Sequence, residues 1–293
     1  MSERGDTTHG DPGWRRVGRG AAQAFRPAED VREITESAAR IQRPITTGRR
    51  IAVTGIRGGA GKSTVTALLA TVFAHHRRDR VLALDIDPDL GTLVPRLGIR
   101  ARRSLAELPD EAEAARTFAG VEPYLLRGGE RLWALSGHRA GIGDSRLDAA
   151  AYGATAVPLT RFFGVTLIDC GPGVEGELIQ AVLGGAHAQV LVTPATPDGA
   201  RSAGRALDLL AGNGFGHLLA RTVVVFTAKG PHSGESLDAG RAAAILNEVG
   251  AATITLRYDR HIAAASVLAP QRFAHTTRVA ALGIAAEALD RAR

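Results

Sequence analysis

The residues of this chain that could do chemistry are concentrated in one glycine-rich run, 54–64. The run follows an apolar segment, 51–53, and precedes a segment with a helical pattern, 65–73. Its glycines let the backbone turn so that successive N–H groups point at one anion. Lys62 adds a positive charge, Ser63 adds a hydroxyl for Mg²⁺, and the start of the helix adds a favourable dipole. The run therefore predicts a cradle for the phosphates of a nucleoside triphosphate.

The spacing of this run differs from the common P-loop pattern, G-x-x-x-x-G-K-[ST], because residue 56 is isoleucine where that pattern has glycine. The run fits the deviant form K-G-G-x-x-K-[ST], with Arg57 in place of the first lysine. Only two of the 36 basic residues are lysines, so the lysine at position 62 indicates a site that needs a compact ammonium group. We expect its side chain to be solvated while the loop is empty. The residues expected to contact phosphates are Gly58, Gly59, Ala60, Gly61, Lys62, Ser63 and Thr64.

Two apolar, strand-like segments further along the chain each end in aspartate. Asp85 and Asp87 follow the first segment, and Asp169 follows the second. In an open parallel sheet the carboxyl ends of the strands share one edge, and ligands bind there. Because Mg²⁺ bound to phosphates needs one or two carboxylates and a hydroxyl, Ser63, Asp87 and Asp169 are the candidate metal ligands, Asp169 through water. Asp87 could also orient or deprotonate an attacking water molecule.

The elements that must position these residues alternate from residue 50 onward. Several predicted strands are continuous apolar runs, as expected for strands buried on both faces. The predicted strands are 50–54, 81–85, 132–136, 165–169, 190–193, 222–227 and 253–256. The predicted helices are 62–76, 145–163, 177–183, 199–211, 237–249 and 276–292. This order predicts an α/β fold of the P-loop NTPase type, a mostly parallel sheet of seven or eight strands with helices on both faces.

The chain divides into a predicted N-terminal extension, 1–48, and one predicted globular domain, 49–293. Residues 1–26 have little apolar content, so we expect them to lack regular structure. Residues 27–42 carry an apolar stripe at helical spacing, and Pro44 ends the pattern. We expect this helix to pack on the domain or on a partner.

The composition excludes several classes of protein. With 45% hydrophobic residues in 293, the chain can bury a full core. A single cysteine, Cys170, excludes an internal disulfide framework, and the Arg-rich N-terminus has no apolar signal segment. The longest uncharged stretch, 178–197, contains polar residues and two prolines, so it does not predict a membrane span. We therefore expect a cytoplasmic protein without stable membrane insertion.

Three motifs, in this order, resemble those of the ParA/MinD family of deviant-Walker ATPases over about residues 50–289. They are the P-loop at 57–64, an Asp-x-Asp-Pro strand end at 85–88 and an Asp-x-Gly-Pro switch at 169–172. The resemblance is greatest to MinD-like ATPases associated with type VII (ESX) secretion, on segments 87–93, 132–137 and 258–261. It implies ATP and Mg²⁺ as ligands, a homodimer when ATP is bound, and slow hydrolysis.

The resemblance also implies roles for individual residues. Lys62, Asp87 and Arg57 would act in catalysis, with Arg57 reaching phosphates across the dimer. A switch segment would run from Asp169 to Gly171 and respond to the nucleotide. Lys229 is a further candidate contact, along the adenine base, although its segment lacks the asparagine that many relatives carry there.

Three functions remain open. The first is a nucleotide-switched regulator of a secretion or cell-envelope system, acting through protein partners. The second is a partitioning ATPase whose ATP-bound dimer binds DNA non-specifically. The third is a nucleotide-binding scaffold that no longer hydrolyses ATP.

The distribution of charge argues mildly against DNA binding. The formal net charge is +6, and residues 1–50 account for +3 of it, with ten Arg against seven Asp and Glu. The remaining 243 residues therefore carry only +3, a weak surplus for contacts with a phosphate backbone. Two local arginine clusters, 77–80 and 100–103, could still contact phosphates or an acidic partner.

Overall fold

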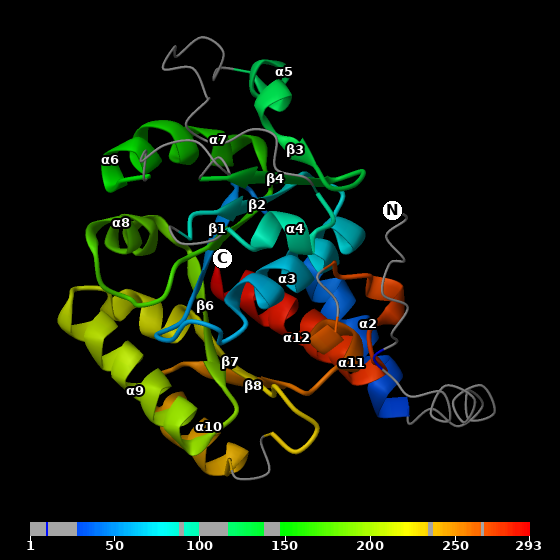
Figure 1. The fold of residues 1–293 in the computed structure, drawn as a ribbon, viewed down its shortest axis with the longest axis vertical. Helices are drawn as coiled ribbons and strands as arrows, with labels where there is room; N and C mark the ends of the chain where they lie inside the picture. The colour runs from blue at the N-terminus through cyan, green and yellow to red at the C-terminus, as the bar shows by residue number, and fades with distance from the viewer. Residues whose placement is uncertain are drawn as a thin grey trace.

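The computed structural model describes residues 10, 28–87, 91–99, 117–137, 147–233, 237–264 and 267–293. Within these residues eight strands form one sheet, in the order β3-β4-β2-β5-β1-β6-β7-β8 (Figure 1). All neighbouring strands are parallel except β3 and β4. The strands are β1 (Arg49–Thr54), β2 (Val81–Asp85), β3 (Leu126–Arg127), β4 (Leu132–Ser136), β5 (Val165–Asp169), β6 (Ala188–Pro194), β7 (Thr222–Thr227) and β8 (Ala252–Leu256).

The predicted α/β fold is confirmed, and so are all seven predicted strands. Among the strands of the described residues, β3 alone was not predicted, and it pairs antiparallel with β4 at one edge of the sheet. It has two residues, and this length is too short to show the alternation by which a strand is recognised.

Helices cover both faces of the sheet. One layer contains α2 (Ala28–Gln42), α3 (Lys62–His76), α4 (Leu93–Arg96), α11 (Arg260–Ala264) and α12 (His275–Arg291). The other contains α5 (Phe118–Val121), α6 (Ala149–Ala151), α7 (Val157–Leu159), α8 (Glu177–Gly185), α9 (Pro197–Gly212) and α10 (Ala239–Glu248). No helix in the described part of the chain is long and apolar enough to cross a bilayer.

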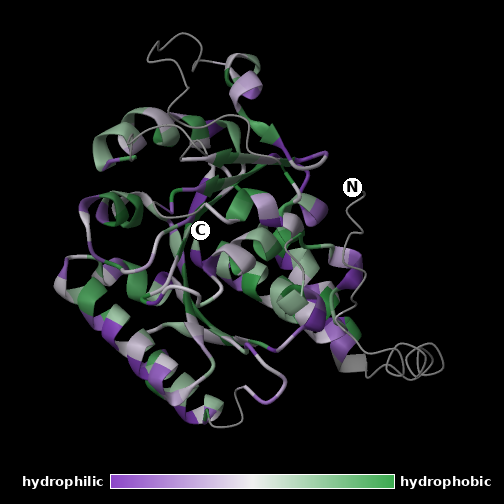
Figure 2. Ribbon diagram, viewed as in Figure 1, coloured by the Kyte–Doolittle hydropathy of each residue, from purple (hydrophilic) through white to green (hydrophobic). Residues whose placement is uncertain are grey.

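The alternation of side chains along each strand divides the interior into two cores. In β1, Ile51 and Val53 point into the core beneath α3 and α12, whereas Ala52 points into the core on the other face. All three side chains are fully buried. Figure 2 shows apolar residues along the strands and hydrophilic residues on the helices around them. The sheet therefore forms the middle of three layers, as continuous apolar strands predict.

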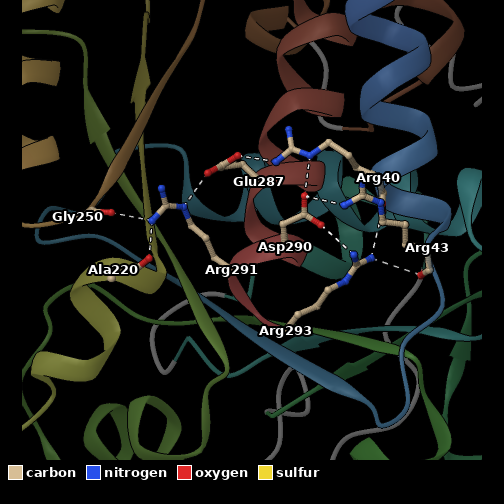
Figure 3. A network of polar contacts seen from close by, with 8 residues as sticks. All are labelled: Arg40, Arg43, Ala220, Gly250, Glu287, Asp290, Arg291 and Arg293. Atoms are coloured by element: carbon tan, nitrogen blue, oxygen red, sulfur yellow. Dashed lines mark hydrogen bonds and ion pairs between the residues drawn. The ribbon is translucent and has the colours of Figure 1, made fainter.

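The predicted helix at 27–42 is present as α2, and it packs on the domain. It lies along α12, and its residue Ile41 is fully buried in the core beneath that helix. The Arg40 side chain makes ion pairs of 2.6 Å to Glu287 and 2.7 Å to Asp290, both on α12 (Figure 3). Arg293, after the end of α12, donates to the backbone carbonyl of Arg40 at 3.1 Å. These contacts fasten the N-terminal and C-terminal helices to each other.

The helix predicted over 145–163 is present over residues 149–162, although it is not a regular α-helix throughout, and residues 145–146 lie outside the described part. The segment begins with α6, widens into a π-helical turn, η5 (Tyr152–Ala156), continues as α7, and ends in a 3₁₀ turn, η6 (Thr160–Phe162). Pro158 lies within α7 and has no N–H to donate to a preceding carbonyl. The regular α-helical hydrogen bonds cannot run through this point, so the helix changes its type here without a break in the helical run.

The first arginine cluster, 77–80, is used largely inside the fold. Arg77 is buried, pairs with Asp79 at 2.6 Å and donates to the carbonyl of Ile41 at 2.5 Å. The guanidinium carbon of Arg80 lies 3.8 Å from the centroid of the Phe118 ring. The second cluster, 100–103, lies outside the described residues.

Candidate nucleotide-binding site

The glycine-rich run connects β1 to α3 at the carboxyl edge of the sheet, as its position in the sequence predicts. Gly59 and Gly61 have backbone φ angles of 70° and 99°, in the left-handed region that favours glycine. Gly61 directly precedes the first residue of α3. Substituting either glycine would strain the turn that starts the helix, so the run needs glycine for its backbone geometry.

Hydrogen bonds from two neighbouring segments hold the run in place. The hydroxyl of Thr227, at the end of β7, donates to the carbonyl of Ala60 at 2.7 Å. The backbone N–H of Gly173, in the loop after β5, donates to the carbonyl of Gly55 at 2.9 Å. The loop shape therefore depends on the ends of two further strands.

The Lys62 side chain is buried, with 6% of its surface exposed, so the expectation of a solvated lysine is wrong. Its alkyl stem passes over Gly55, where an added Cβ atom would lie 3.4 Å from the lysine stem and 2.5 Å from the carbonyl oxygen of Val192. Glycine at position 55 therefore avoids a clash with the Val192 carbonyl, while the lysine stem lies at ordinary contact distance. The fold therefore fixes the course of the lysine side chain along the inside of the loop.

Asp169 is buried beneath the loop and is only partly satisfied. One carboxylate oxygen accepts a hydrogen bond from the Thr66 hydroxyl at 3.1 Å, and the other has no hydrogen-bond partner within the described residues. Burial, and then the proximity of Asp85, raise the pKa of Asp169 to about 7, against the hydrogen bond from Thr66 and the positive charge of Lys62. A buried carboxylate oxygen without a partner indicates that a cation or a water molecule belongs beside it.

This donor set fits Mg²⁺. No group of three or more His, Cys, Asp or Glu residues that could hold a metal by themselves occurs in the described residues. A phosphate-bound Mg²⁺ does not need such a group, because water and phosphate oxygens supply most of its ligands. The Ser63 hydroxyl and the unsatisfied oxygen of Asp169 provide the hydroxyl and carboxylate that remain, and Asp87 lies in the wall of the adjoining pocket.

The two aspartates that follow β2 differ in their surroundings. Asp85 is buried, and its carboxylate accepts the backbone N–H groups of Asp87 and Leu93, both at 3.2 Å. Burial is the main cause that raises the pKa of Asp85 to about 6. Asp87 instead lines the pocket. Asp85 therefore shapes the loop, and Asp87 faces the space where a ligand would bind.

A pocket of about 560 Å³ opens over the P-loop. Residues 58–65 form its floor, and Asp87, 227–229 and 256–259 lie around it. The volume falls within the range of ordinary small-molecule sites. Lys229 lies in this wall with its ammonium beside Gly59, since a Cβ atom added to that glycine would lie 3.8 Å from the lysine nitrogen.

The structure brings most of the predicted site residues together. All seven P-loop residues, Asp87 and Lys229 line the pocket, and Asp169 lies beneath its floor. Gly171 does not line the pocket, and neither do the other residues of the switch segment, whereas the neighbouring Pro172 does.

Arg57 lies outside the pocket. Its guanidinium makes an ion pair of 2.6 Å with Asp198, in the first turn of α9, and both side chains are about half exposed. Within the described residues, therefore, Arg57 makes no contact that brings it to the nucleotide pocket.

Sequence reasoning missed Arg96, which ends the four-residue helix α4 and lines the pocket. The chain has 34 arginines, and nothing in the local pattern around residue 96 distinguishes this one. The only available signal was its place a few residues after Asp87.

The segment 258–261 has a structural role that its sequence did not reveal. The Asp259 carboxylate accepts the backbone N–H of His261 at 2.8 Å, the N–H of Ala274 at 2.7 Å and the hydroxyl of Thr277 at 2.8 Å. It thus joins the start of α11 to the start of α12, beside the pocket.

Comparison with protein families gives a match over most of the domain. The family described as the CobQ/CobB/MinD/ParA nucleotide binding domain matches residues 51–265. The chain is also 32% identical over 238 residues to the ESX-1 secretion-associated protein EspI of Mycobacterium tuberculosis. The match covers 77% of this chain and 34% of the relative, so the chain spans about a third of the length of that protein.

Solved structures show the same fold. A ParA family ATPase from Chlorobium tepidum superimposes with a TM-score of 0.63 at 15% identity, covering 81% of this chain and 98% of that one. The cell division ATPase MinD of Pyrococcus furiosus gives a TM-score of 0.62 at 20% identity, with 83% and 99% covered.

Proposed function

The chain belongs to the CobQ/CobB/MinD/ParA nucleotide-binding family, and we propose that it is an ATP-dependent switch that dimerises with ATP and hydrolyses it slowly. The proposal depends on the arrangement of one pocket. The P-loop with its buried Lys62 forms the floor of this pocket, and the Asp87 carboxylate lies in its wall. Beneath the floor of that pocket lies a buried carboxylate oxygen without a partner. We also propose that residues 49–293 form the switch domain and that α2 fastens the extension 1–48 to it.

In the proposed mechanism the P-loop holds the phosphates. Its backbone N–H groups bind the phosphate oxygens, and the Lys62 ammonium neutralises their charge. The Ser63 hydroxyl and Asp169 would hold Mg²⁺, which when bound would supply positive charge to stabilise the phosphate oxygens. Asp87 accepts a hydrogen bond from the attacking water and so orients it.

We propose that Arg57 acts on the partner protomer. Its place outside the pocket, half exposed and paired with Asp198, supports a role at a surface that a second protomer would meet. The planar guanidinium can hold two phosphate oxygens at once, and it is charged at every accessible pH.

We propose that the regulated process is secretion, through a protein partner. The relationship to EspI, whose name associates that protein with ESX-1 secretion, supports this proposal. DNA binding is the second candidate, and the internal use of Arg40, Arg77 and Arg80 argues against it, because these cations pair or stack within the fold.

The test compares the protein with ATP and Mg²⁺, with ADP and Mg²⁺, and without nucleotide. We expect light scattering to show a dimer only in the sample with ATP and Mg²⁺. The same sample should release phosphate slowly. A monomer in all three states would contradict the switch, and ATP-dependent dimers without phosphate release would favour the non-hydrolysing scaffold. Binding to a DNA duplex in the ATP state, measured at two salt concentrations, would favour the partitioning function if it falls steeply with salt.

A further inference from the structure

Arg96 is held rigidly in the wall of the nucleotide pocket. It is the last residue of α4, whose residues Leu93 and Val94 are buried in the core. Its carbonyl accepts the backbone N–H of Leu268 at 2.8 Å, so the end of the helix is tied to the segment after α11. The backbone that carries the guanidinium is therefore fixed by packing and by a hydrogen bond.

The Arg96 side chain has no anionic partner at contact distance within the described residues. It forms no ion pair or side-chain hydrogen bond there, although it is half-buried. Burial lowers the pKa of Arg96, and the negative charge of Asp169 acts against that shift. A partly desolvated guanidinium that lacks a hydrogen-bonded anion is unfavourable, so this position is incomplete without a ligand.

Two other buried or half-buried arginines of the described residues pair with carboxylates. Arg77 pairs with Asp79, and Arg40 pairs with Glu287 and Asp290. Unlike these two arginines, Arg96 faces a pocket and has no carboxylate at contact distance within the described residues.

The pocket itself indicates which anion would complete the site. Arg96 lines the same 560 Å³ space as the P-loop and Asp87. A phosphate chain lying on the P-loop would bring negative oxygens into that space, and the guanidinium fork matches phosphate oxygens in geometry and charge.

We propose that Arg96 is a phosphate-binding residue that contacts the nucleotide bound to its own protomer. This inference rests on the proposed nucleotide-binding function. It gives Arg96 a different task from Arg57, which is placed to act on a second protomer. The two arginines can therefore be separated by comparing nucleotides.

The test is titration calorimetry of wild type, Arg96→Ala and Arg205→Ala with ADP and with ATP, each with Mg²⁺. Arg205 is an exposed arginine of α9 outside the pocket and serves as the matched control. We expect Arg96→Ala to weaken both nucleotides by about 10- to 100-fold, the range for losing a hydrogen bond to a charged group. Arg205→Ala should bind both as wild type does, and Arg96→Lys should recover part of the loss.

Thermal unfolding without nucleotide separates binding from a structural role. We expect the midpoint of Arg96→Ala to equal or exceed that of wild type, because an unpaired, half-buried charge has been removed. A lowered midpoint together with unchanged affinity, or a loss of affinity for ATP alone, would overturn the inference. Wild-type protein that binds neither nucleotide would overturn the proposed function and this inference with it.

Discussion

Buried or half-buried charges occur in two regions, the seam, which is the contact between α2 and α12, and the nucleotide pocket. The two regions differ in how these charges are paired. In the seam, Arg40 contacts two carboxylates of α12, and Arg291 pairs with Glu287 at 2.8 Å and donates to the carbonyl of Gly250 at 2.7 Å (Figure 3). In the pocket, one oxygen of Asp169 and the guanidinium of Arg96 have no such partners within the described residues.

This difference distinguishes charges that hold the fold together from charges that await a ligand. A buried charge without a partner costs free energy, and a fold keeps it when another molecule supplies the missing contact. Substitutions in the seam should therefore lower stability and leave nucleotide binding unchanged. Substitutions in the pocket should weaken nucleotide binding and should not lower stability.

The largest effect is expected for Asp87→Ala. If Asp87 orients the attacking water, ATP still binds, hydrolysis falls by about 10²- to 10⁴-fold, and the ATP-bound dimer accumulates. Steady-state phosphate release measures the rate, and Asp208→Ala, at an exposed position of α9, is the control. Turnover equal to wild type would remove Asp87 from the reaction.

Lys62→Ala should weaken ATP binding by about 100-fold or more, because it removes the charge closest to the phosphates. The lysine stem is buried, so the unfolding midpoint of the variant must be measured beside its affinity. A folded variant that binds ATP within a few-fold of wild type would contradict the assignment of the phosphate site.

Arg57→Ala should lower ATP-dependent dimerisation and hydrolysis together, by about 10-fold or more, and leave monomer binding of ATP largely intact. Arg57→Lys should keep most of the activity because it retains the charge. Light scattering and phosphate release give the two readouts. An alanine variant that dimerises and turns over like wild type would show that Arg57 has no part in either.

In the seam, Arg40→Ala should lower the free energy of unfolding by about 1–2 kcal/mol, because two half-buried carboxylates each lose one of their partners. Affinity for ADP should not change. The matched control is Arg32→Ala on the same helix, whose pair with Glu36 is exposed and should contribute little. Equal effects of the two substitutions in chemical denaturation would remove the distinction between the seam and the surface.

The last prediction concerns how the stability of the protein without nucleotide and metal depends on pH. The pKa of Asp169 is raised from its usual value near 4 to about 7, so the folded protein binds more protons than the unfolded chain between these values. Without nucleotide and metal, stability should therefore fall as pH rises through this range. Asp169→Asn should make that slope shallower by about 1 kcal/mol per pH unit. Denaturation at several pH values measures this slope in both proteins. An unchanged slope in the variant would contradict a buried, proton-binding Asp169.

Much of the fold and part of the candidate site could be predicted from the sequence. The helix α3 has the predicted bounds, and β2, β4, β5 and β7 also match theirs. These elements were accessible because their signals are local: apolar runs, glycines and the start of a helix. The helix at 145–163 was predicted, but its π-helical and 3₁₀ turns were not, because the hydrogen bonds that replace the one lost at Pro158 depend on how the helix packs.

By itself, the sequence determined the three-layer architecture and the phosphate loop, since strand patterning and the φ angles open only to glycine are properties of neighbouring residues. Only the tertiary structure decided the state of the charged side chains. It buried Lys62, paired Arg57 with Asp198, and left Arg96 in the pocket without an anionic partner at contact distance within the described residues. The solvation and pairing of a charge depend on residues that are far away in the chain, and these meet only when the sheet and helices have assembled.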